Sequence, residues 1–557
     1  MKKLLSLFLV VAATALTACT GNSGGPKIKG DALLYDRENY LSTYRGLRLL
    51  GERYAGENFT FEVTNKGRYP VISNVKTLIV GVDFTDFPAS GLPKGEEGTL
   101  KDLEKAILGK SEDTGWESLK SYYEKSSFGT CKIEGTVAPE WYHTNKSVTQ
   151  FANAGTKNSQ VKVLCKSVED WARETFNLDM REYDANNDGF IDSVIMIYSC
   201  EPHVRVDGRE VDDDLYWAFC WSRDVSAASA DRLNPTSYRF FWASYRTFFE
   251  DGYYDENGKH KDWTDAEIAS GKAKLDAHTL IHEFGHVLSL PDYYNGNYTS
   301  SDPAAYNAIS VDMMAYNIGD HNAWSKALYG WISPIISYGE SEITIRSTTD
   351  TGDFIIIPTE TMYDPKTDFT LLSQFIMLEL VTPTGVAKAD SEDAYAGSYP
   401  TWFSQAGIRA TLVDARLGMF SYSGDTAKDA FQGFTGTVSG GDNYYVKFAY
   451  DNNDINRSAN KNCKLVEIIP AREKLSNGSI IESVPAKNLS GREKNEALYY
   501  EGDEFNTTSS KSLWKNFKID DNYGGRTTPF DYGFIVKSLS NKSATIEIIN
   551  KTIDHSK

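Results

Sequence analysis

The pattern of apolar and polar positions predicts strands mixed with helices in the first part of the chain. The runs Thr77–Phe84 and Ser193–Tyr198 indicate two buried strands. Apolar residues at helical spacing between Val161 and Ala172 indicate an amphipathic helix, and residues 88–98 are expected to form a loop. Another helix is marked by Trp116, Leu119, Tyr122 and Tyr123. This mixture predicts an α/β fold.

A further helix is predicted over residues 274–290. Its apolar stripe at helical spacing consists of Leu275, Ala277, Leu280, Ile281, Phe284 and Leu288. Pro291 should end this helix, because proline cannot continue a helix and restricts the residue before it. A helix with such a stripe is packed, so its polar residues lie on a buried or cleft-lining side.

After residue 335 the pattern changes to short apolar runs, many with alternating polarity. Gly, Asn, Asp and Ser separate the runs, which is typical of all-β structure. The runs are Ile343 to Ile345, Phe354 to Ile357, Phe375 to Leu380, Ile408 to Val413, Leu465 to Ile469 and Phe534 to Val536. We expect one region over residues 71–480 with a β-rich extension, then a β-sandwich-like region over residues 481–557.

The predicted helix over residues 274–290 contains the segment His282-Glu283-Phe284-Gly285-His286. Histidines at positions i and i+4 lie on the same helix face, so both rings can reach one metal ion. A glutamate beside the first histidine can hold a metal-bound water, as in zinc peptidases. Since the chain has only 8 histidines, this spacing would be a rare coincidence. The alternative, a surface helix with two solvated histidines, conflicts with the apolar stripe.

A zinc site that keeps one position open for water needs a third protein ligand. Asp292 follows Pro291 directly and could fold back to the ion, although it could instead only shape the turn. His278 lies four residues before His282, but the residue after it is Thr279 rather than glutamate. We therefore interpret His278 as a packing or supporting residue.

The stretch from Leu275 to Pro334 resembles the M6 family of metallopeptidases, the immune-inhibitor-A-like enzymes. The family signature is similar to H-E-x-G-H-x-x-G-L-P-D-x-Y, and this chain has HEFGHVLSLPDYY. The segment Ser310–Met314 resembles the family's aspartate-x-methionine turn, which implies Met314, or alternatively Met313, as the floor of the metal site. The helix that follows this turn in the family is matched by Ala323–Trp331. Ser289 stands where the family has glycine, which adopts a positive φ without strain.

The resemblance implies an α/β zincin-like, metzincin-like catalytic domain followed by the β-rich C-terminal region. It also implies a zinc endopeptidase that acts on proteins or peptides, with Zn²⁺ held by His282, His286 and Asp292. Glu283 would be the general base for an attacking water. A different class stays open: an inactive binding lipoprotein whose β-rich half captures glycans or proteins. Glu379 could face the site or be a structural partner.

A second ion site is predicted in the acidic segment before the second buried strand. The segment follows the pattern D-x-N-x-D-G-x-x-D, with oxygen side chains at positions 1, 3, 5 and 9 from Asp184, Asn186, Asp188 and Asp192. Such a loop can wrap Ca²⁺, and glycine at position 6 permits the sharp turn. Position 12 is Ile195 rather than glutamate, so a complete EF-hand is excluded. The alternative is a solvated acidic turn.

The N-terminus indicates export. Residues 1–18 have a basic start and an apolar run from Leu4 to Leu16 that is too short for an ordinary membrane span. The segment Leu16–Cys19 resembles a bacterial lipobox, which implies a lipid-anchored mature chain that starts at Cys19. The alternative is an ordinary secretory cleavage site. Residues 19–70 would form a tether and a propeptide or N-terminal arm, and we expect an outer-membrane, cell-surface or secreted protein.

Composition and length limit the classes of partner and the number of domains that we expect. The net charge of −19 argues against nucleic-acid binding, which needs basic patches. A chain of 557 residues with 41% hydrophobic residues suits two or three packed domains. Without Cys19, an odd number of cysteines remains, so at least one is free or pairs with another molecule. They are Cys131, Cys165, Cys200, Cys220 and Cys463.

Overall fold

The structure is a computed structural model, and it describes most of the chain. The described residues are 25–35, 60–63, 71–156, 159–212, 214–225, 229–250, 252–294, 311–359, 369–392, 401–421, 434–437, 443–452, 464–471, 495–508, 518–519 and 528–550. The signal segment 1–18, Cys19, Cys463 and the boundary expected at residue 480 lie outside these ranges. Among the described residues, no helix has the length and apolar character needed to cross a membrane.

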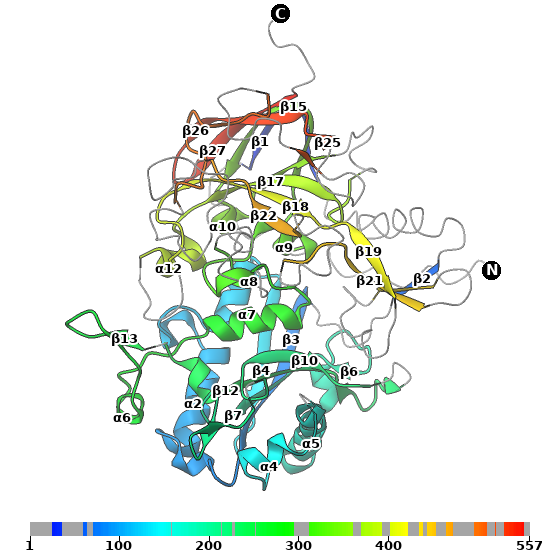
Figure 1. The fold of residues 1–557 in the computed structure, drawn as a ribbon. Helices are drawn as coiled ribbons and strands as arrows, with labels where there is room; N and C mark the ends of the chain where they lie inside the picture. The colour runs from blue at the N-terminus through cyan, green and yellow to red at the C-terminus, as the bar shows by residue number, and fades with distance from the viewer. Residues whose placement is uncertain are drawn as a thin grey trace, which may run out of the picture.

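A six-stranded sheet forms the centre of the N-terminal half (Figure 1). In spatial order its strands are β10 (Phe219–Ser222), β12 (Arg239–Ser244), β7 (Val194–Tyr198), β3 (Ser73–Asp83) and β4 (Cys131–Val137), and β5 (Tyr142–His143) pairs with the end of β3. All pairs are parallel except that between β10 and β12. Parallel strands buried on both faces have near-continuous apolar runs. For this reason the sequence predicted β3 and β7 correctly.

Helices cover both faces of this sheet. They are α2 (Gly95–Leu108), α3 (Leu119–Ser126), α4 (Val148–Ala152), α5 (Ser159–Phe176) and α7 (His278–Val287). Alternate residues of β3 enter different cores: Val75 and Ile79 pack with α2, α3 and α7, whereas Leu78 and Val80 pack with α4 and α5. The N-terminal half is therefore a layered α/β structure.

Two helices differ from the sequence-based expectation. α2 begins at Gly95, inside the stretch 88–98 that was expected to be a loop, and it buries Leu100 and Leu103. α7 lies inside the expected range 274–290 but ends well before Pro291. Its end is set by Ser289, which has a φ of 79° and reverses the chain. The proline therefore follows the end of the helix rather than causing it.

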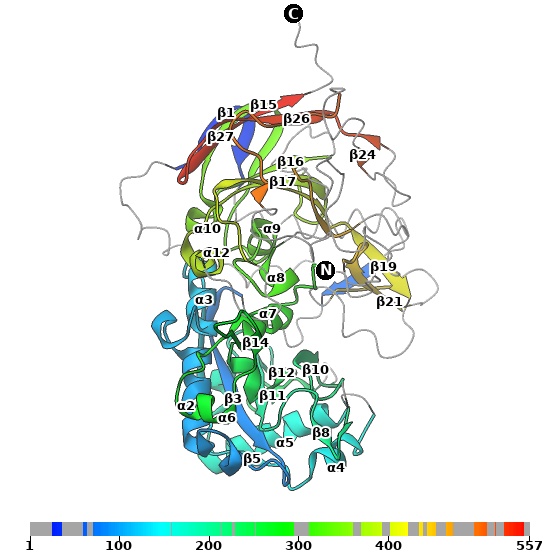
Figure 2. The same ribbon diagram turned by 60° about the vertical axis from the view of Figure 1, so that its left-hand side comes forward.

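A nine-stranded sheet dominates the C-terminal half and curls around its own apolar core (Figure 2). Its strands are β22 (Val466–Ile468), β18 (Gly407–Asp414), β17 (Gln374–Val381), β16 (Phe354–Pro358), β15 (Ile335–Arg346), β27 (Ser543–Asn550), β26 (Tyr532–Leu539) and β23 (Glu504–Phe505), and β1 (Lys27–Leu34) also pairs with β15. Only the pair β15–β16 is parallel among these pairs. Strands from both ends of the chain thus share one sheet.

Shorter elements complete the described chain. The remaining helices are α6 (Asp265–Ala269), α8 (Met313–Tyr316), α9 (Ala323–Leu328), α10 (Thr348–Thr351), α12 (Lys388–Glu392) and the 3₁₀ helices η2 (Ala89–Gly91), η3 (Ser111–Asp113), η4 (Met180–Tyr183), η6 (Tyr245–Phe248) and η8 (Gly385–Ala387). A four-stranded sheet has the strand order β19 (Leu417–Ser421), β21 (Asn443–Phe448), β20 (Phe434–Thr437) and β2 (Thr60–Val63). The two-stranded sheets consist of β11 (Thr236–Ser237) with β6 (Phe190–Ile191), β13 (Tyr253–Tyr254) with β14 (His260–Lys261), β8 (Arg205–Val206) with β9 (Arg209–Glu210), and β24 (Lys518–Ile519) with β25 (Thr528–Pro529).

The two halves share a continuous core. Ile355 and Leu378 of the curled sheet point into that sheet's own core. Their neighbours Ile356 and Met377 point to the other side, into the core that contains α2, α3 and α7. Apolar burial of this kind is the main favourable term in folding, so the halves stabilise each other.

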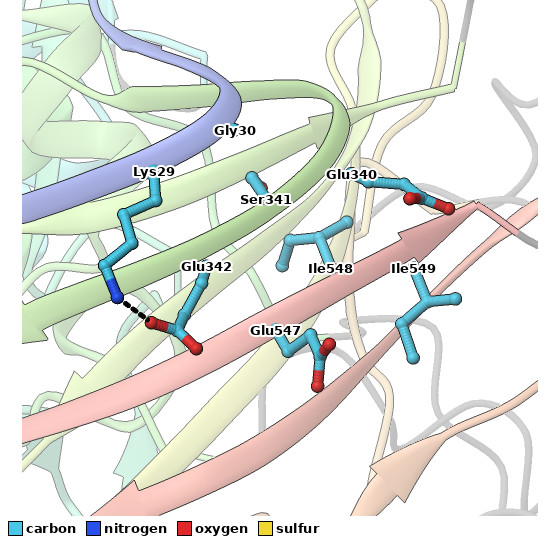
Figure 3. A pocket seen from close by; sticks show the side chains of 8 residues that line it. All are labelled: Lys29, Gly30, Glu340, Ser341, Glu342, Glu547, Ile548 and Ile549. Carbon is cyan, nitrogen blue, oxygen red and sulfur yellow. Dashed lines mark hydrogen bonds and ion pairs between the residues drawn. The ribbon is translucent and has the colours of Figure 1, made fainter.

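A hollow of about 400 Å³ lies over β1, β15 and β27, in the curled sheet (Figure 3). Its lining consists of Lys29, Gly30, Glu340, Ser341, Glu342, Glu547, Ile548 and Ile549. Lys29 and Glu342 form an ion pair of 2.6 Å within it. The lining contains no histidine or cysteine, and the strands β1 and β27 that carry part of it lie apart from α7 (Figure 1).

Candidate metal centre

The candidate metal centre is built on α7 and on the turn that ends this helix. At the first turn, the Asp276 carboxylate accepts a hydrogen bond of 2.7 Å from the backbone N–H of His278. At the last turn, the N–H of Leu290 donates to the carbonyl of Gly285 at 3.0 Å, and the N–H of Ser289 donates to His286 at 2.9 Å. These two bonds and the positive φ of Ser289 form a Schellman motif. Serine therefore keeps the turn that glycine was expected to provide.

The turn brings Asp292 back to the two histidines. The Oδ1 atom of Asp292 lies 3.1 Å from Nε2 of His282 and 3.3 Å from Nε2 of His286. Ligand atoms of His282, Glu283 and His286 also lie within 4.8 Å of one another. The structure thus brings together the three residues that the sequence suggested as metal ligands.

Hydrogen bonds on the far side of each ring show which nitrogen faces the site. The Nδ1 atom of His282 lies 2.8 Å from the carbonyl oxygen of Met313, and that of His286 lies 2.8 Å from the carbonyl oxygen of Leu290. A carbonyl can only accept, so each Nδ1 carries the hydrogen. In a neutral ring, Nε2 then presents a lone pair toward Asp292.

Two lone pairs facing one carboxylate oxygen require a proton or a cation between them. Burial lowers the pKa of His286, but Asp292 outweighs burial and raises it to about 9. Burial raises the pKa of Asp292, yet the two histidines hold it well below its usual range. Two imidazole nitrogens and one carboxylate oxygen are a donor set that fits zinc and leaves a position for water.

Glu283 stands beside this donor set. Its half-buried carboxylate lies near the backbone of Cys220, in the edge strand β10, and this backbone acts to lower its pKa. Burial raises the pKa of Glu283, although His286 and His282 oppose the shift. A carboxyl with a raised pKa is better matched to proton transfer near neutral pH.

The turn that carries Met314 lies directly under α7. Asp312 caps the N-terminus of α8. It accepts a hydrogen bond of 2.9 Å from the N–H of Met314 through one oxygen, and one of 3.0 Å from the N–H of Asn322 through the other. A Cβ atom on Gly285 would lie only 2.3 Å from the sulfur of Met314. The glycine of the motif therefore leaves room for the methionine. Met313 contributes its backbone carbonyl to His282.

Further residues lie near the site, and those outside the motif could not be found from sequence spacing. Arg239 in β12 donates to the carbonyl of His286 at 3.1 Å, and the ring of Tyr294 stacks on that of His282 with centroids 6.3 Å apart. Tyr294 is the last residue of the motif HEFGHVLSLPDYY, whereas Arg239 and Cys220 come from distant strands and carry no local signal. Glu379 proves to be a structural partner, with its carboxylate 2.9 Å from Arg409.

The predicted calcium loop folds around its own carboxylates. Asp184 accepts hydrogen bonds of 2.9 Å from the N–H groups of Asp188 and Gly189, and Asp192 accepts one of 2.8 Å from Ala185. Burial raises the pKa of Asp192 to about 8, and the charges of Asp184 and Asp188 add to the shift. Several carboxylates are thus held close together without a cationic side chain among these bonds.

Comparison with known proteins agrees with this site. Residues 103–316 match the catalytic domain of the immune inhibitor A peptidase M6 family. This chain carries an M6 metallopeptidase catalytic domain. Immune inhibitor A of Bacillus thuringiensis subsp. alesti is 25% identical to it over 255 residues, which cover 40% of this chain and 34% of that protein. The match therefore spans about a third of that relative, and most of the β-rich half lies beyond the matched domain.

Replacing Ser289 with glycine should stabilise the M6 domain. Serine at positive φ costs about 1 kcal/mol, and glycine removes this strain while the turn stays the same. We expect the thermal unfolding midpoint of Ser289→Gly to rise slightly at equal zinc concentration. Ser270→Gly is the control, because Ser270 ends α6 at a φ of −76° and gains nothing from glycine. A lower midpoint for Ser289→Gly would contradict the strain that we infer.

Proposed function

We propose that this chain is a zinc-dependent endopeptidase that hydrolyses peptide bonds of proteins. The observation that carries the proposal is the convergence of His282, His286 and Asp292, with Glu283 beside them. Three protein ligands and one open position are the arrangement of catalytic rather than structural zinc. The M6 family supports a metal-dependent peptidase, and the donor set supports zinc as the metal.

The chain's own residues then have distinct tasks. When bound, zinc would lower the pKa of a water and polarise the substrate carbonyl. Glu283 accepts the proton of that water and passes it to the leaving amine. The backbone of Cys220 lies beside the glutamate, and the backbone carbonyls of Met313 and Leu290 hold the two imidazoles. Such partners behind the ligands fix ring orientation.

The proposal also includes the fold of the catalytic domain and the location of the protein in the cell. A metzincin-like catalytic domain is supported by the motif helix α7 against a mixed sheet and by the methionine turn beneath it. The lipobox-like segment supports a lipid anchor at Cys19 in the cell envelope, on an exported protein. The β-sandwich expected over residues 481–557 stays a prediction; the described strands β23, β26 and β27 lie in the curled sheet.

The acidic loop adds a structural Ca²⁺ to the proposal. The ligands would be the side chains of Asp184, Asn186, Asp188 and Asp192. Their spacing suits calcium, and the raised pKa of the buried Asp192 indicates that a cation would be favourable there. The hydrogen bonds of this loop given above stay within residues 184–192, and the strand β6 that continues from it lies apart from α7 (Figure 1), so this ion would stabilise the fold rather than take part in hydrolysis.

Metal content is the first test of the zinc site. The purified full-length chain should contain about one zinc ion per molecule, since catalytic zinc is held stoichiometrically. His286→Ala should lose this zinc, because it removes one of the three ligands. His203→Ala is the control, because His203 is exposed and pairs with Glu210. Elemental analysis measures the content, and equal zinc in both variants would place the metal elsewhere.

Proteolysis tests the role of Glu283. Loss of a general base lowers the rate by about a hundredfold or more, so Glu283→Gln should fail to cleave an unfolded protein while retaining zinc. Glu174→Ala, which removes an exposed carboxylate from α5, should cleave at the wild-type rate. Gel analysis of the fragments gives the readout. Equal cleavage by wild type and Glu283→Gln would overturn the proposed mechanism, and no cleavage by either would favour the binding lipoprotein.

Calcium should raise the melting temperature of the chain. A ligand at about 100 times its Kd stabilises the folded state by about 2.7 kcal/mol. The combined variant Asp184→Ala/Asp188→Ala should lose this gain, whereas Glu174→Ala should keep it. Thermal melts with and without added calcium, at fixed zinc, give the comparison. A full gain in the double variant would rule the loop out as the binding site.

A further inference from the structure

The β-rich half reaches into the catalytic half through one buried carboxylate. Asp390 lies in α12 and is completely buried. One of its oxygens is 3.1 Å from Nε2 of His278, the first residue of α7. The other accepts a hydrogen bond of 2.6 Å from the N–H of Gly319, in the segment that follows the methionine turn. A single side chain therefore joins the motif helix to the segment beneath it.

The His278 ring, at the start of α7, is held on several sides. Its Nδ1 lies 2.7 Å from the carboxylate of Asp276, so both ring nitrogens face carboxylates and both carry hydrogens. Burial lowers the pKa of His278, but Asp276 and Asp390 outweigh burial and raise it to about 10. The ring also stacks on Trp116 at 3.9 Å, nearly parallel. Trp116 in turn donates from its indole N–H to the carbonyl of Val386, just before α12, at 2.6 Å.

The segment under α7 is fastened to the β-rich half at three further points. A Cβ atom on Gly319 would lie 2.1 Å from the ring of Trp402, so the backbone rests directly on that ring. Arg409 donates to the carbonyl of Val311 at 3.0 Å. Glu379 accepts a hydrogen bond of 2.8 Å from the N–H of Ala323. These contacts hold both ends and the middle of the segment 311–323.

We propose that Asp390 is a positioning residue of the metal centre, which sets the first turn of α7 against the segment that carries Met314. The inference rests on the proposed zinc site and extends it. All the supports named here from the β-rich half follow residue 316, where the family match ends. Contacts from the matched domain and from the β-rich half beyond it therefore together set the positions of the metal ligands.

Asp390→Asn tests this inference in the full-length chain. Asparagine has the same shape but only one accepting atom, so the N–H groups of His278 and Gly319 cannot both be accepted. We expect zinc to bind about tenfold more weakly, as with other residues that support metal ligands. Competition with a chelator measures the zinc Kd, and the visible absorption spectrum of the Co²⁺-loaded chain should shift as the ligand geometry changes.

A matched control separates positioning from general loss of stability. Asp353 is also buried, lies in the same half, and pairs with Arg346 at 2.8 Å. Asp353→Asn therefore removes a comparable charge without touching α7 or the segment 311–323. Its zinc Kd and Co²⁺ spectrum should equal those of the wild type. A folded Asp390→Asn with the wild-type Kd and spectrum would overturn the inference.

If Asp390→Asn does not fold, hydrogen exchange measured on the wild-type chain tests the inference instead. Coupling between sites is reciprocal, so zinc should increase the hydrogen-exchange protection of Gly319 and of residues 386–392. Residues 346–353 should show no change. Equal exchange with and without zinc at Gly319 and residues 386–392 would overturn this inference and leave the proposed zinc site intact. A wild-type chain that binds no zinc would instead overturn the proposed function and this inference with it.

Discussion

The reversal of the chain at Ser289 is the constraint on which the metal centre depends. Without it, the chain would continue past His286 and carry Asp292 away from the two histidines. The same turn brings the carbonyl of Leu290 to Nδ1 of His286, which orients that ring. A strained residue persists when its surroundings over-determine it. Here the paired helix-end bonds and the buried side chain of Leu290 supply that support.

A single core lets the two halves act as one scaffold. The apolar core that contains the buried side chains of α7 also contains side chains from strands of the curled sheet, such as Ile356 and Met377. A shift of the curled sheet would therefore disturb the packing under the motif helix. Close-packed interiors transmit such strain, because few voids are available to absorb it. This explains how a half beyond the family match can influence the site.

Local features of the sequence were predictable, and contacts between distant residues were not. The motif residues, the turn with Asp292 and the strands β3 and β7 follow from spacing over a few positions. The helix α2 was missed although Leu100 and Leu103 lie on one face, because its start in a glycine-rich stretch suggested a loop. Asp390 is 112 residues from His278, and only the packed fold shows that they meet. Arg239 and Cys220 reach the site for the same reason.

The charges buried around the site suggest why it is built from polar groups rather than apolar ones. Besides Asp390 and His278, the pair Glu379–Arg409 is almost fully enclosed. Buried ion pairs add little net stability, because desolvation offsets their attraction, but breaking one partner is costly. Their bonds are also directional, whereas apolar contacts tolerate sliding. Directional bonds of this kind favour a single position of the segment 311–323 under α7. A metal site needs fixed ligand distances, so a single well-defined position of this segment matters more to the site than additional stability.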